Sequence, residues 1–339
     1  MKYYACSSIE NFELAFLGHI DIGNCVTFCC EDVKEKPMIG LREPKETVEE
    51  ILRLYQDVKL KSIQLAEEGV SDSVLTGCIK CPMFQLKQKE IQSISEVKKR
   101  MIYDYIKMIN ISVYPAPCQA KCIYCNVRKF KRLIQYNENF KEFYNRMFEI
   151  IRLLQEEYHL IKPSTNWFIA SGEITIHPLK RKLYDLTMDK NVVYCSNCFK
   201  YDEQLGDILA TNRNAKLSFS IDSGTPETWS LVKGANNWET MRENLNRYYK
   251  KALSCQQIRL KYIMLTGIND NPQEYAAVIN LLQDLGLRSL EIARNQYETD
   301  IQRSVKDTAT FIQCLKKANI EYQLRGYSPE EAKQINEIL

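Results

Sequence analysis

The sequence predicts an α/β protein whose main part is a partial (β/α)6 TIM-like barrel. From residue 106 onwards, short apolar runs rich in β-branched residues alternate with longer segments of helical periodicity. This alternation is typical of parallel βαβ units with right-handed crossovers. Polar motifs follow several of the predicted strands, at the C-terminal strand ends where barrel enzymes have their active sites. A small α+β module is expected before the barrel, because residues 1–90 lack this alternation.

We expect the barrel to occupy residues 106–325, with six strands separated by helices. The predicted strands are residues 107–113, 166–170, 191–195, 216–221, 258–265 and 289–293. The clearest helices are residues 139–158, 240–253 and 273–285, the last with apolar residues near helical spacing. A charged helical connector is predicted at residues 91–105 and a C-terminal helix at residues 326–339.

The N-terminal module, residues 1–90, begins with two short strands at residues 13–17 and 26–28. A helix is predicted at residues 47–68, followed by a glycine-containing loop that presents Cys78 and Cys81 in a C-x2-C pair. So small a module buries little apolar surface by itself. A metal centre would therefore stabilise it.

The composition is that of an ordinary soluble globular protein, with 45% hydrophobic and 26% charged residues among 339. The formal net charge is only +3 and basic residues interleave with acidic ones, which gives no reason to expect a nucleic-acid partner. No apolar run is long enough for a membrane span, and the first residues lack the apolar region of a signal peptide. We therefore expect a cytoplasmic protein without a membrane partner.

Thirteen cysteines are many for a cytoplasmic chain, in which clustered thiols more often bind metal than form disulfides. Two of them, Cys255 and Cys314, stand alone and are expected to be packing or surface thiols. The others form five groups, namely Cys6; Cys25, Cys29 and Cys30; Cys78 and Cys81; Cys118, Cys122 and Cys125; and Cys195 and Cys198.

The most closely spaced group, Cys118, Cys122 and Cys125, has the pattern C-x3-C-x2-C and follows the first predicted barrel strand. Thiolates are soft ligands that suit zinc or an iron–sulfur cluster. A closed structural zinc site takes four protein ligands, whereas three thiolates on a [4Fe–4S] cubane leave one iron open for chemistry. A zinc knuckle or unrelated thiols are the alternatives.

This loop resembles the cluster loop of the radical SAM superfamily. The resemblance implies that Cys118, Cys122 and Cys125 hold a [4Fe–4S] cluster whose open iron binds S-adenosylmethionine (SAM), and it assigns Tyr124 to the cofactor site. Four later segments resemble further motifs of the family, in the same order and on successive strands. The resemblance covers about residues 105–300.

After the second strand, residues 170–178 resemble the family's Gly-Gly-Glu-Pro segment, which contacts the methionine amino group of SAM. The resemblance assigns Gly172 and Glu173 to this contact, since a carboxylate can pair with an ammonium group. Ser171 and Ile174 replace the family's first Gly and its Pro. We interpret His177 as a structural residue and not as a general base.

After the third strand, residues 194–198 resemble the family's Thr/Ser-Asn-Gly turn, which assigns Asn197 to the cofactor site. Cys198 replaces the glycine of that turn. We predict that Cys198, or otherwise Cys195, is a catalytic thiol that donates a hydrogen atom to the substrate radical or acts as a redox thiol. Inert packing thiols are the alternative.

After the fourth strand, residues 218–224 alternate polar and apolar side chains, so the polar ones share a face. The segment resembles the family's ribose motif, which implies that Ser220 and Asp222 face the sugar of SAM. An exposed strand end with turn-forming residues is the alternative. After the fifth strand, residues 265–270 resemble the family's Gly-x-Asn-Asp turn near the adenine, although this sequence is also ordinary turn chemistry.

The N-terminal module resembles the SPASM/twitch type of auxiliary-cluster domain, here placed before the core. The resemblance implies one auxiliary [4Fe–4S] cluster held by Cys6, Cys29, Cys78 and Cys81. Either Cys25 or Cys30 could replace Cys29. A zinc site with the same four ligands is the alternative.

The resemblance implies an enzyme that reductively cleaves SAM to a 5′-deoxyadenosyl radical. The radical would abstract hydrogen from a C–H bond of a carbohydrate, a small polar molecule or a peptide, in an epimerisation, a dehydrogenation or a cross-linking. The electron donor would be a protein such as flavodoxin or ferredoxin. The alternative, from another class, is a non-catalytic electron-transfer or zinc-scaffold protein on the same fold.

Overall fold

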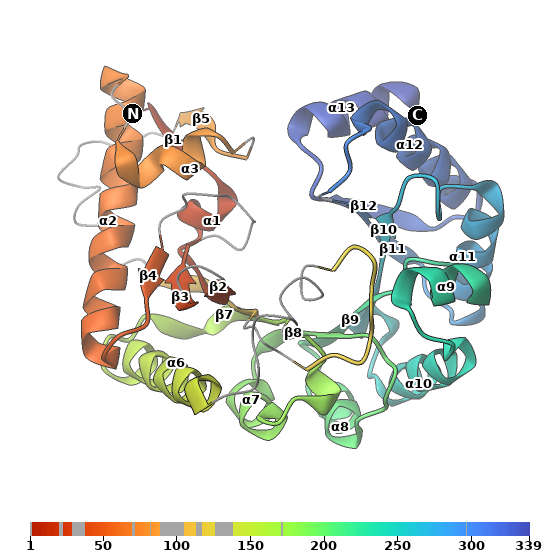
Figure 1. The fold of residues 1–339 in the computed structure, drawn as a ribbon, viewed down its shortest axis with the longest axis horizontal. Coiled ribbons are helices and arrows are strands. Elements are labelled where there is room, and N and C mark those ends of the chain that lie inside the picture. Colours follow the sequence, from red (N-terminus) through yellow and green to blue (C-terminus); the bar gives the residue numbers. More distant parts are fainter. Residues whose placement is uncertain are drawn as a thin grey trace. The chain divides into compact units, whose positions relative to one another are not determined.

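The computed structural model describes residues 2–19, 23–28, 38–69, 72–81, 83–88, 105–112, 117–125, 138–170, 172–295 and 297–339. The chain divides into two compact units. Unit 1 comprises Met1–Pro115 and Ile134–Ile169, and unit 2 comprises Ala116–Leu133 and Ala170–Leu339. Figure 1 shows the helices and strands of both units.

The sheet of unit 1 has the strand order β4-β3-β2-β6-β7. The strands β2 (Glu13–His19), β3 (Gly23–Thr27) and β4 (Met38–Gly40) are antiparallel neighbours. The strand β6 (Ile106–Ser112) pairs in parallel with β2 on one side and with β7 (Ile161–Ile169) on the other. The N-terminal hairpin therefore belongs to the same sheet as the first strands of the predicted barrel.

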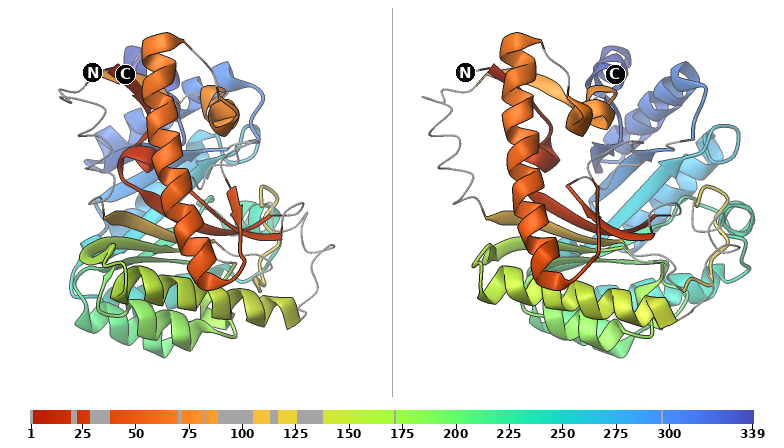
Figure 2. Two further views of the ribbon diagram at one scale, coloured as in Figure 1. Left: turned by 90° about the vertical axis from the view of Figure 1, so that its left-hand side faces the viewer. Right: turned by 60° about the vertical axis from the view of Figure 1, so that its left-hand side comes forward.

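Two long helices of unit 1, α2 (Pro44–Glu68) and α6 (Glu138–Glu156), pack against each other (Figure 2). On the buried face of α2, the Tyr55 ring stacks on Phe12 with the ring centroids 3.8 Å apart. The Tyr55 hydroxyl donates a 2.9 Å hydrogen bond to the carbonyl of Ile9, at the end of the short helix α1 (Ser7–Glu10). This aromatic contact joins α2 to the N-terminal segment, and α2 ends at Gly69 in the left-handed conformation that favours glycine.

A separate two-stranded ribbon in unit 1 pairs β1 (Lys2–Ala5) with β5 (Gln85–Gln88) in antiparallel fashion. The short helices η1 (Ser73–Leu75) and α3 (Thr76–Ile79) precede β5 in the chain. Because Ala5 lies opposite Gln85, Cys6, which follows β1, lies close to the residues that precede β5.

Unit 2 contains a parallel sheet in which β8 to β12 follow one another in chain order. The strands are β8 (Asn191–Ser196), β9 (Ala215–Ser220), β10 (Ile258–Met264), β11 (Ser289–Arg294) and β12 (Glu321–Arg325). The α-helices are α7 (Lys180–Thr187), α8 (Glu203–Thr211), α9 (Pro226–Lys233), α10 (Trp238–Lys251), α11 (Pro272–Asp284), α12 (Ile301–Lys317) and α13 (Pro329–Ile338). Two 3-10 turns, η2 (Ile174–Ile176) and η3 (Cys255–Gln257), complete the unit within the described residues.

The strands of unit 2 present two different faces, because successive side chains of a strand alternate. Helices cover one face of these strands (Figure 1). On that face Phe219, Tyr262 and Ile292 are fully buried, and Phe311 of α12 packs on Tyr262. The opposite face, called here the polar face, carries half-buried or exposed polar side chains. These are Cys195, Lys216, Ser218, Ser220, Arg259, Lys261, Glu291, Gln323 and Arg325.

The predicted fold class is confirmed, because the structure is a mixed α/β fold in which parallel strands alternate with helices. The six predicted barrel strands correspond to β6 to β11, and the predicted helices at residues 47–68, 139–158, 240–253 and 273–285 correspond to α2, α6, α10 and α11. The C-terminal helix predicted at residues 326–339 corresponds to α13. The predicted connector at residues 91–105 lies outside the described residues except for Tyr105, and the predicted domain boundaries stay predictions.

Two strands differ from expectation for local reasons. The strand β7 begins at Ile161, five residues before the predicted start at residue 166, although Pro163 interrupts the apolar pattern there. The Thr165 hydroxyl bridges this irregular start, since it accepts from the N–H of Lys162 at 3.0 Å and donates to the carbonyl of Ile106 at 2.7 Å. The edge strand β12 was not predicted, because charged and polar residues dominate its five positions.

Candidate active site

The loop that carries Cys118, Cys122 and Cys125 belongs to unit 2 and is held by the end of α9. The N–H groups of Lys121 and Ile123 donate to the carbonyls of Lys233 and Val232, at 2.8 and 3.0 Å. Directly after α9, Gly234 has a φ of +64°, and a Cβ atom there would lie 2.8 Å from the Cβ of Lys121. The close approach of the loop to α9 therefore requires glycine at this position.

The three thiols of the loop lie within electrostatic reach of one another. Burial, together with the charges of Glu173, Cys122 and Cys125, raises the pKa of the Cys118 thiol to about 11. Within the described residues, no group of three His, Cys, Asp or Glu side chains converges tightly enough for a single metal ion. Each thiolate ligand of a [4Fe–4S] cubane binds a separate iron atom, so neighbouring thiols on one loop suit it.

The carboxylate of Glu173 is fully buried and joins the cluster loop to the turn after β8. Its Oε1 accepts from the N–H of Thr175 at 3.0 Å and from the Ser196 hydroxyl at 2.8 Å, and its Oε2 accepts from the N–H of Asn197 at 2.6 Å. Its own N–H donates to the carbonyl of Pro117 at 2.8 Å. Burial raises the pKa of Glu173, and these hydrogen bonds to the carboxylate oppose that rise.

Two other predicted cofactor-site residues lie next to Glu173: Gly172 precedes it in the chain, and the N–H of Asn197 donates to its carboxylate. The Asn197 side-chain amide donates to the Cys118 Sγ at 3.6 Å, so the β8 turn contacts one thiol of the cysteine loop directly. Gly172 has a φ of +55°, a backbone conformation that favours glycine. The structure thus brings Glu173 and Asn197 together with the cysteine loop.

The two cysteines of the β8 turn occupy different surroundings. Cys198 has a φ of +56° and no exposed surface, and burial raises the pKa of its thiol well above the usual range. The positive φ is the conformation in which glycine would be expected, which agrees with the glycine of the family turn. Cys195 lies on the polar face, where burial raises its pKa to about 11 while Lys261 and Arg325 act in the opposite direction. Full burial favours the packing interpretation for Cys198.

Asp222, predicted to face a ribose, forms a buried triad with Tyr124 and Lys233. Its Oδ2 accepts from the Lys233 ammonium at 2.5 Å and also from the Tyr124 hydroxyl, while Lys233 donates to the Tyr124 oxygen at 2.7 Å. Its Oδ1 accepts from the N–H of Ile263 at 2.7 Å. Burial, followed by the Asp222 charge, raises the pKa of Tyr124 well above its usual range. Ser220, the other predicted ribose contact, is half-buried on the polar face.

The sequence did not identify Lys233 as a site residue. It is the last residue of α9 and directly precedes Gly234. Its ammonium also lies over the rings of Tyr124 and Trp229, 5.2 and 5.5 Å from their centroids. Cation–π contacts of this kind stabilise an ammonium group that is removed from water. No feature of the sequence alone connects residue 233 with residue 124.

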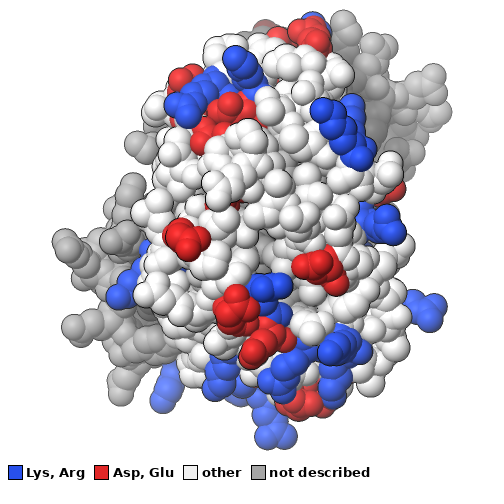
Figure 3. Space-filling model, turned by 90° about the vertical axis from the view of Figure 1, so that its right-hand side faces the viewer, with Lys and Arg blue, Asp and Glu red and all other residues white. Residues whose placement is uncertain are grey.

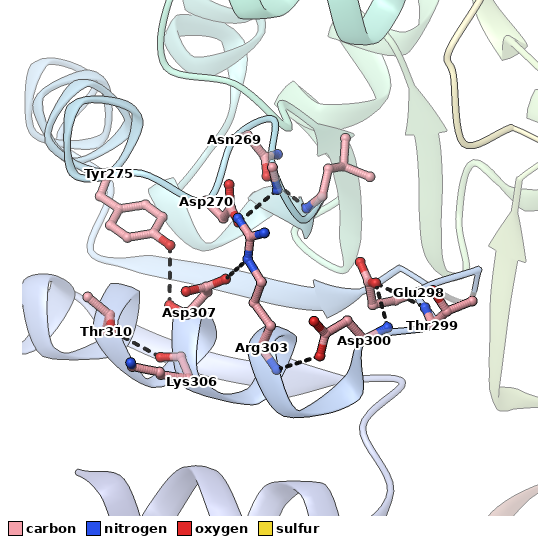
Figure 4. A network of polar contacts seen from close by, with 12 residues as sticks. Asn269, Asp270, Tyr275, Glu298, Thr299, Asp300, Arg303, Lys306, Asp307 and Thr310 are labelled. Carbon is pink, nitrogen blue, oxygen red and sulfur yellow. Dashed lines mark hydrogen bonds and ion pairs between the residues drawn. The ribbon is translucent and has the colours of Figure 1, made fainter.

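The turn predicted at residues 265–270 follows β10 and hydrogen-bonds the backbone next to the triad. The Asn269 amide donates to the carbonyls of Asp222 and Ile263, both at 2.9 Å. Asp270 accepts from the Arg303 guanidinium at 2.9 Å, and Arg303 also pairs with Asp307 at 3.4 Å (Figure 4). These contacts fix the turn, and the predicted position of the adenine beside it stays a prediction.

An apolar cluster lies at the same strand ends, and it consists of Val232, Ile263, Leu265 and Ala293, with Tyr124 and Ile268 packed against it. Apolar side chains next to a few fixed polar groups are typical of cofactor sites. This surface is compatible with the predicted adenine contact.

In unit 1, three of the four predicted auxiliary ligands are described. Burial, together with the charges of Cys6 and Cys81, raises the pKa of Cys78 to about 12, and Cys81 also acts on Cys6, so the three thiols lie within electrostatic reach of one another. The β1–β5 pairing brings Cys6 to Cys81, and Cys81 donates its N–H to the carbonyl of Cys78 at 2.9 Å. Cys29 and Cys30 lie outside the described residues. Cys25 is fully buried, with its Sγ 4.0 Å from the Met38 Sδ.

The surface charge follows the sequence expectation of interleaved signs. On the face drawn in Figure 3, Lys and Arg side chains alternate with Asp and Glu side chains. Ion pairs between side chains of opposite sign include Lys251 with Glu203 and Asp207, and Arg303 with Asp270. None of the described helices combines the length and the apolar character that crossing a bilayer requires.

Comparison with known proteins gives one family. The model of the radical SAM superfamily matches residues 116–318. No curated protein sequence matches the chain.

Several solved structures resemble the chain at low identity. Streptococcus suis SuiB bound to S-adenosylmethionine is 12% identical, with a TM-score of 0.48 over 96% of this chain and 72% of that one. SuiB bound to its precursor peptide SuiA is 12% identical, with a TM-score of 0.49 over 95% and 73% of the two chains. A radical SAM methyltransferase from Sphaerobacter thermophilus is 16% identical, with a TM-score of 0.45 over 61% and 63%. Such distant likenesses carry no argument about substrate.

The family match covers more than half of the chain. It includes the cysteine loop, Glu173, Asn197 and the triad that holds the loop. The chain belongs to the radical SAM superfamily and is a radical SAM enzyme, which uses a [4Fe–4S] cluster and SAM.

Proposed function

We propose that Cys118, Cys122 and Cys125 hold the catalytic cluster and that the enzyme abstracts a hydrogen atom from a C–H bond of a polar substrate. The observation that carries the proposal is the connection of the three-thiol loop to the β8 turn, through Asn197 on Cys118 and through Glu173. When bound there, the reduced cluster and SAM would supply one electron and, on cleavage of the S–C5′ bond, a 5′-deoxyadenosyl group able to take a hydrogen atom from the substrate, with methionine and 5′-deoxyadenosine as the products.

The residues of the chain position the reactants. Gly172 and Glu173 are proposed to bind the methionine amino group, with Asn197 alongside, because a buried carboxylate next to the cluster loop favours an ammonium group. The Tyr124–Asp222–Lys233 triad orients the Tyr124 ring against the apolar cluster. Ser220 is proposed to contact the sugar. Positioning of this kind keeps the radical beside one carbon and away from solvent.

The substrate is proposed to be a carbohydrate or another small polar molecule, with a peptide as the second choice. The polar face supports this preference, since its hydroxyl, amide and charged side chains can hydrogen-bond a polar ligand. Epimerisation, dehydrogenation and cross-linking all begin with the same abstraction. For an epimerisation, Cys195 is better placed than Cys198 to return a hydrogen atom, because only Cys195 lies on the polar face.

An auxiliary [4Fe–4S] cluster is proposed in unit 1, on Cys6, Cys78 and Cys81 together with Cys29. The mutual proximity of the three described thiols supports it. Soft thiolate ligands suit an iron–sulfur cluster, and a zinc site remains the competing assignment. Such a cluster could accept an electron from the substrate or relay one from an external donor such as flavodoxin or ferredoxin.

The decisive experiment is an assay of the anaerobically reconstituted full-length protein with SAM and dithionite. Formation of 5′-deoxyadenosine and methionine is expected, and chromatography with mass detection measures both products. A non-catalytic electron-transfer or zinc-scaffold protein would bind metal but form neither. Absence of 5′-deoxyadenosine from protein with a full complement of iron and sulfide would refute the proposal.

A further inference from the structure

The strand β12 lies at the edge of the parallel sheet of unit 2. It pairs with β11 on one side, and none of the described strands pairs with its other side. The N–H of Glu321 donates to the carbonyl of Arg288, next to β11, at 2.8 Å. Because successive residues of a strand direct their backbone groups to opposite sides, those of Tyr322 and Leu324 point away from β11. The free edge of β12 therefore offers the N–H and carbonyl groups of these two residues to another strand.

The sequence of β12 does not prevent further pairing of this edge. The strand contains no proline and no glycine, and its register with β11 is continuous. Natural edge strands are usually protected by lysine, proline or a bulge. In β12 the exposed residues are instead Glu321 at one end, Arg325 at the other and Gln323 midway between them. The edge is thus suited to a strand with the complementary order of charges.

We propose that β12 pairs with β12 of a second copy of this chain, in antiparallel fashion about a two-fold axis at Gln323. In this register, Tyr322 of each copy lies opposite Leu324 of the other copy. Two opposite residues whose backbone groups face each other exchange both of their N–H···O=C bonds. The outward groups of Tyr322 and Leu324 meet this condition in both symmetry-related pairs, so self-pairing satisfies the free edge.

The same register brings opposite charges together on the polar face. Glu321 of each copy lies opposite Arg325 of the other copy, in a pair without backbone hydrogen bonds, where side chains are closest. Arg325 also pairs with Glu291 at 3.4 Å, and the five donors of its guanidinium group can serve a second carboxylate. A parallel copy in register would place Glu321 opposite Glu321, which is unfavourable. The charges therefore favour a second copy of this chain in antiparallel orientation.

The surface at the start of β12 has room for the other copy. A hollow there is lined by Lys316, Asn319, Ile320, Glu321 and Tyr322. In the proposed register, Ile320 lies opposite Gly326 of the other copy, the residue without a side chain at which the chain leaves β12. The hollow can therefore receive the turn between β12 and α13 of the other copy. A contact of this kind, with the same patch on both subunits, gives a closed two-fold dimer.

The inference goes beyond the proposed function and does not depend on it. The test uses the full-length reconstituted protein under anaerobic and reducing conditions. One pair of edge strands buries little surface, so the dimer should be weak and should depend on concentration. Sedimentation velocity at several concentrations should show exchange between the 39.7 kDa monomer and a dimer.

Two charge reversals should weaken this dimer. Arg325→Glu and Glu321→Arg each place like charges opposite each other in both symmetry-related pairs. Each should therefore raise the dissociation constant of the dimer by about tenfold or more. The matched control is Arg213→Glu, which makes the same change of charge at another exposed residue of unit 2 and should leave the constant unchanged.

Mixing the two charge reversals should restore association. The Arg325→Glu strand carries two acidic ends and the Glu321→Arg strand two basic ends, so opposite charges meet only between unlike copies. An equimolar mixture, with an affinity tag on one variant, should form a heterodimer that copurifies and sediments as the wild-type dimer does. Melting temperature and iron content show that each variant is folded. Arg325→Gln replaces Arg325→Glu if the latter does not fold, since its Glu321 still meets an arginine of the other variant.

Three results would overturn the inference. One is a wild-type protein that stays monomeric up to its solubility limit, which would leave the edge to another kind of strand. The second is a dimer that neither charge reversal weakens, because that dimer would use another surface. The third is a pair of folded variants that do not associate when mixed.

Discussion

The Lys233 Nζ lies 2.5 Å from the Asp222 Oδ2, and the two side chains are only 2% and 0% exposed. The hydroxyl of Tyr124 contacts both groups, so this ion pair holds an aromatic ring of the cluster loop in place. Three protein donors, from Lys233, Tyr124 and the N–H of Ile263, already occupy the Asp222 carboxylate. Asp222 therefore mainly holds the cysteine loop in place through Tyr124. The ribose contact assigned to it by resemblance stays a prediction.

Lys233→Met should destabilise the metal-free protein by about 3–5 kcal/mol, because it leaves a buried carboxylate without its counter-ion. Urea denaturation under reducing conditions measures the change in the free energy of unfolding. Lys233→Arg keeps the charge, so its free energy of unfolding should decrease less. The control is Lys251→Met, whose exposed ammonium pairs with Glu203 and Asp207 and should matter little. If Lys233→Met and Lys251→Met lowered the free energy of unfolding equally, the buried Lys233–Asp222 pair would not be a special source of stability.

Cys122→Ala should abolish formation of 5′-deoxyadenosine, because a cubane with two thiolate ligands is not held in the loop. The same reconstituted protein should keep the iron of the cluster proposed in unit 1. The control is Cys255→Ala, which removes an exposed thiol far along the chain and should retain full activity. Full activity of Cys122→Ala would overturn the assignment of the catalytic cluster.

The variant in which Cys118, Cys122 and Cys125 are all replaced by Ala should still bind about four irons and four sulfides, as one remaining cubane requires. Inorganic iron and sulfide analysis after anaerobic reconstitution measures this. Further substitution of Cys78 and Cys81 should remove the remainder. A single zinc without sulfide in the triple variant would instead assign unit 1 a structural zinc site.

His177 should make stability depend on acidity. Burial lowers its pKa from 6.5 to about 4, and its Nδ1 accepts from the N–H of Leu179 at 3.1 Å, which requires the neutral ring. The unfolded chain binds the proton more readily than the folded protein. The contribution of His177 to the free energy of unfolding is therefore fully present above pH 6.5, and about 3 kcal/mol of it is lost as the pH decreases towards 4.

Replacement by Gln tests this dependence without a titratable ring. In His177→Gln, the pH-dependent loss between 6.5 and 4 should be smaller by that amount, as measured by urea denaturation at several pH values. His159→Gln replaces an exposed histidine and should keep the wild-type dependence. An unchanged profile in His177→Gln would show that His177 is not the titrating group.

Cys198 should tolerate glycine better than alanine, because its φ of +56° strains any residue with a Cβ atom. Cys198→Gly is expected to have a free energy of unfolding at least equal to that of Cys198→Ala. Both should form 5′-deoxyadenosine at the wild-type rate, since the thiol has no exposed surface. Loss of product with continued SAM cleavage would restore Cys198 as a hydrogen donor.

The sequence determined the fold class and the order of the motifs along the chain. Apolar runs such as those of β8 and β10 and the helical periodicity of α11 depend on local pattern, so they were predictable. The cysteine loop was visible because Cys118, Cys122 and Cys125 lie within eight residues. The turn at Cys198 was visible as a departure from the family glycine, and its positive φ is a local property.

Only the tertiary structure decided what these residues contact. The partners of Asp222 are Lys233, eleven residues away, and Tyr124, ninety-eight residues away in sequence. The pairing of Glu291 with Arg325 likewise depends on an edge strand that the sequence did not reveal. Hydrogen bonds and ion pairs of this kind depend on distances between atoms that only packing sets, whereas periodicity reports merely which face of an element is buried.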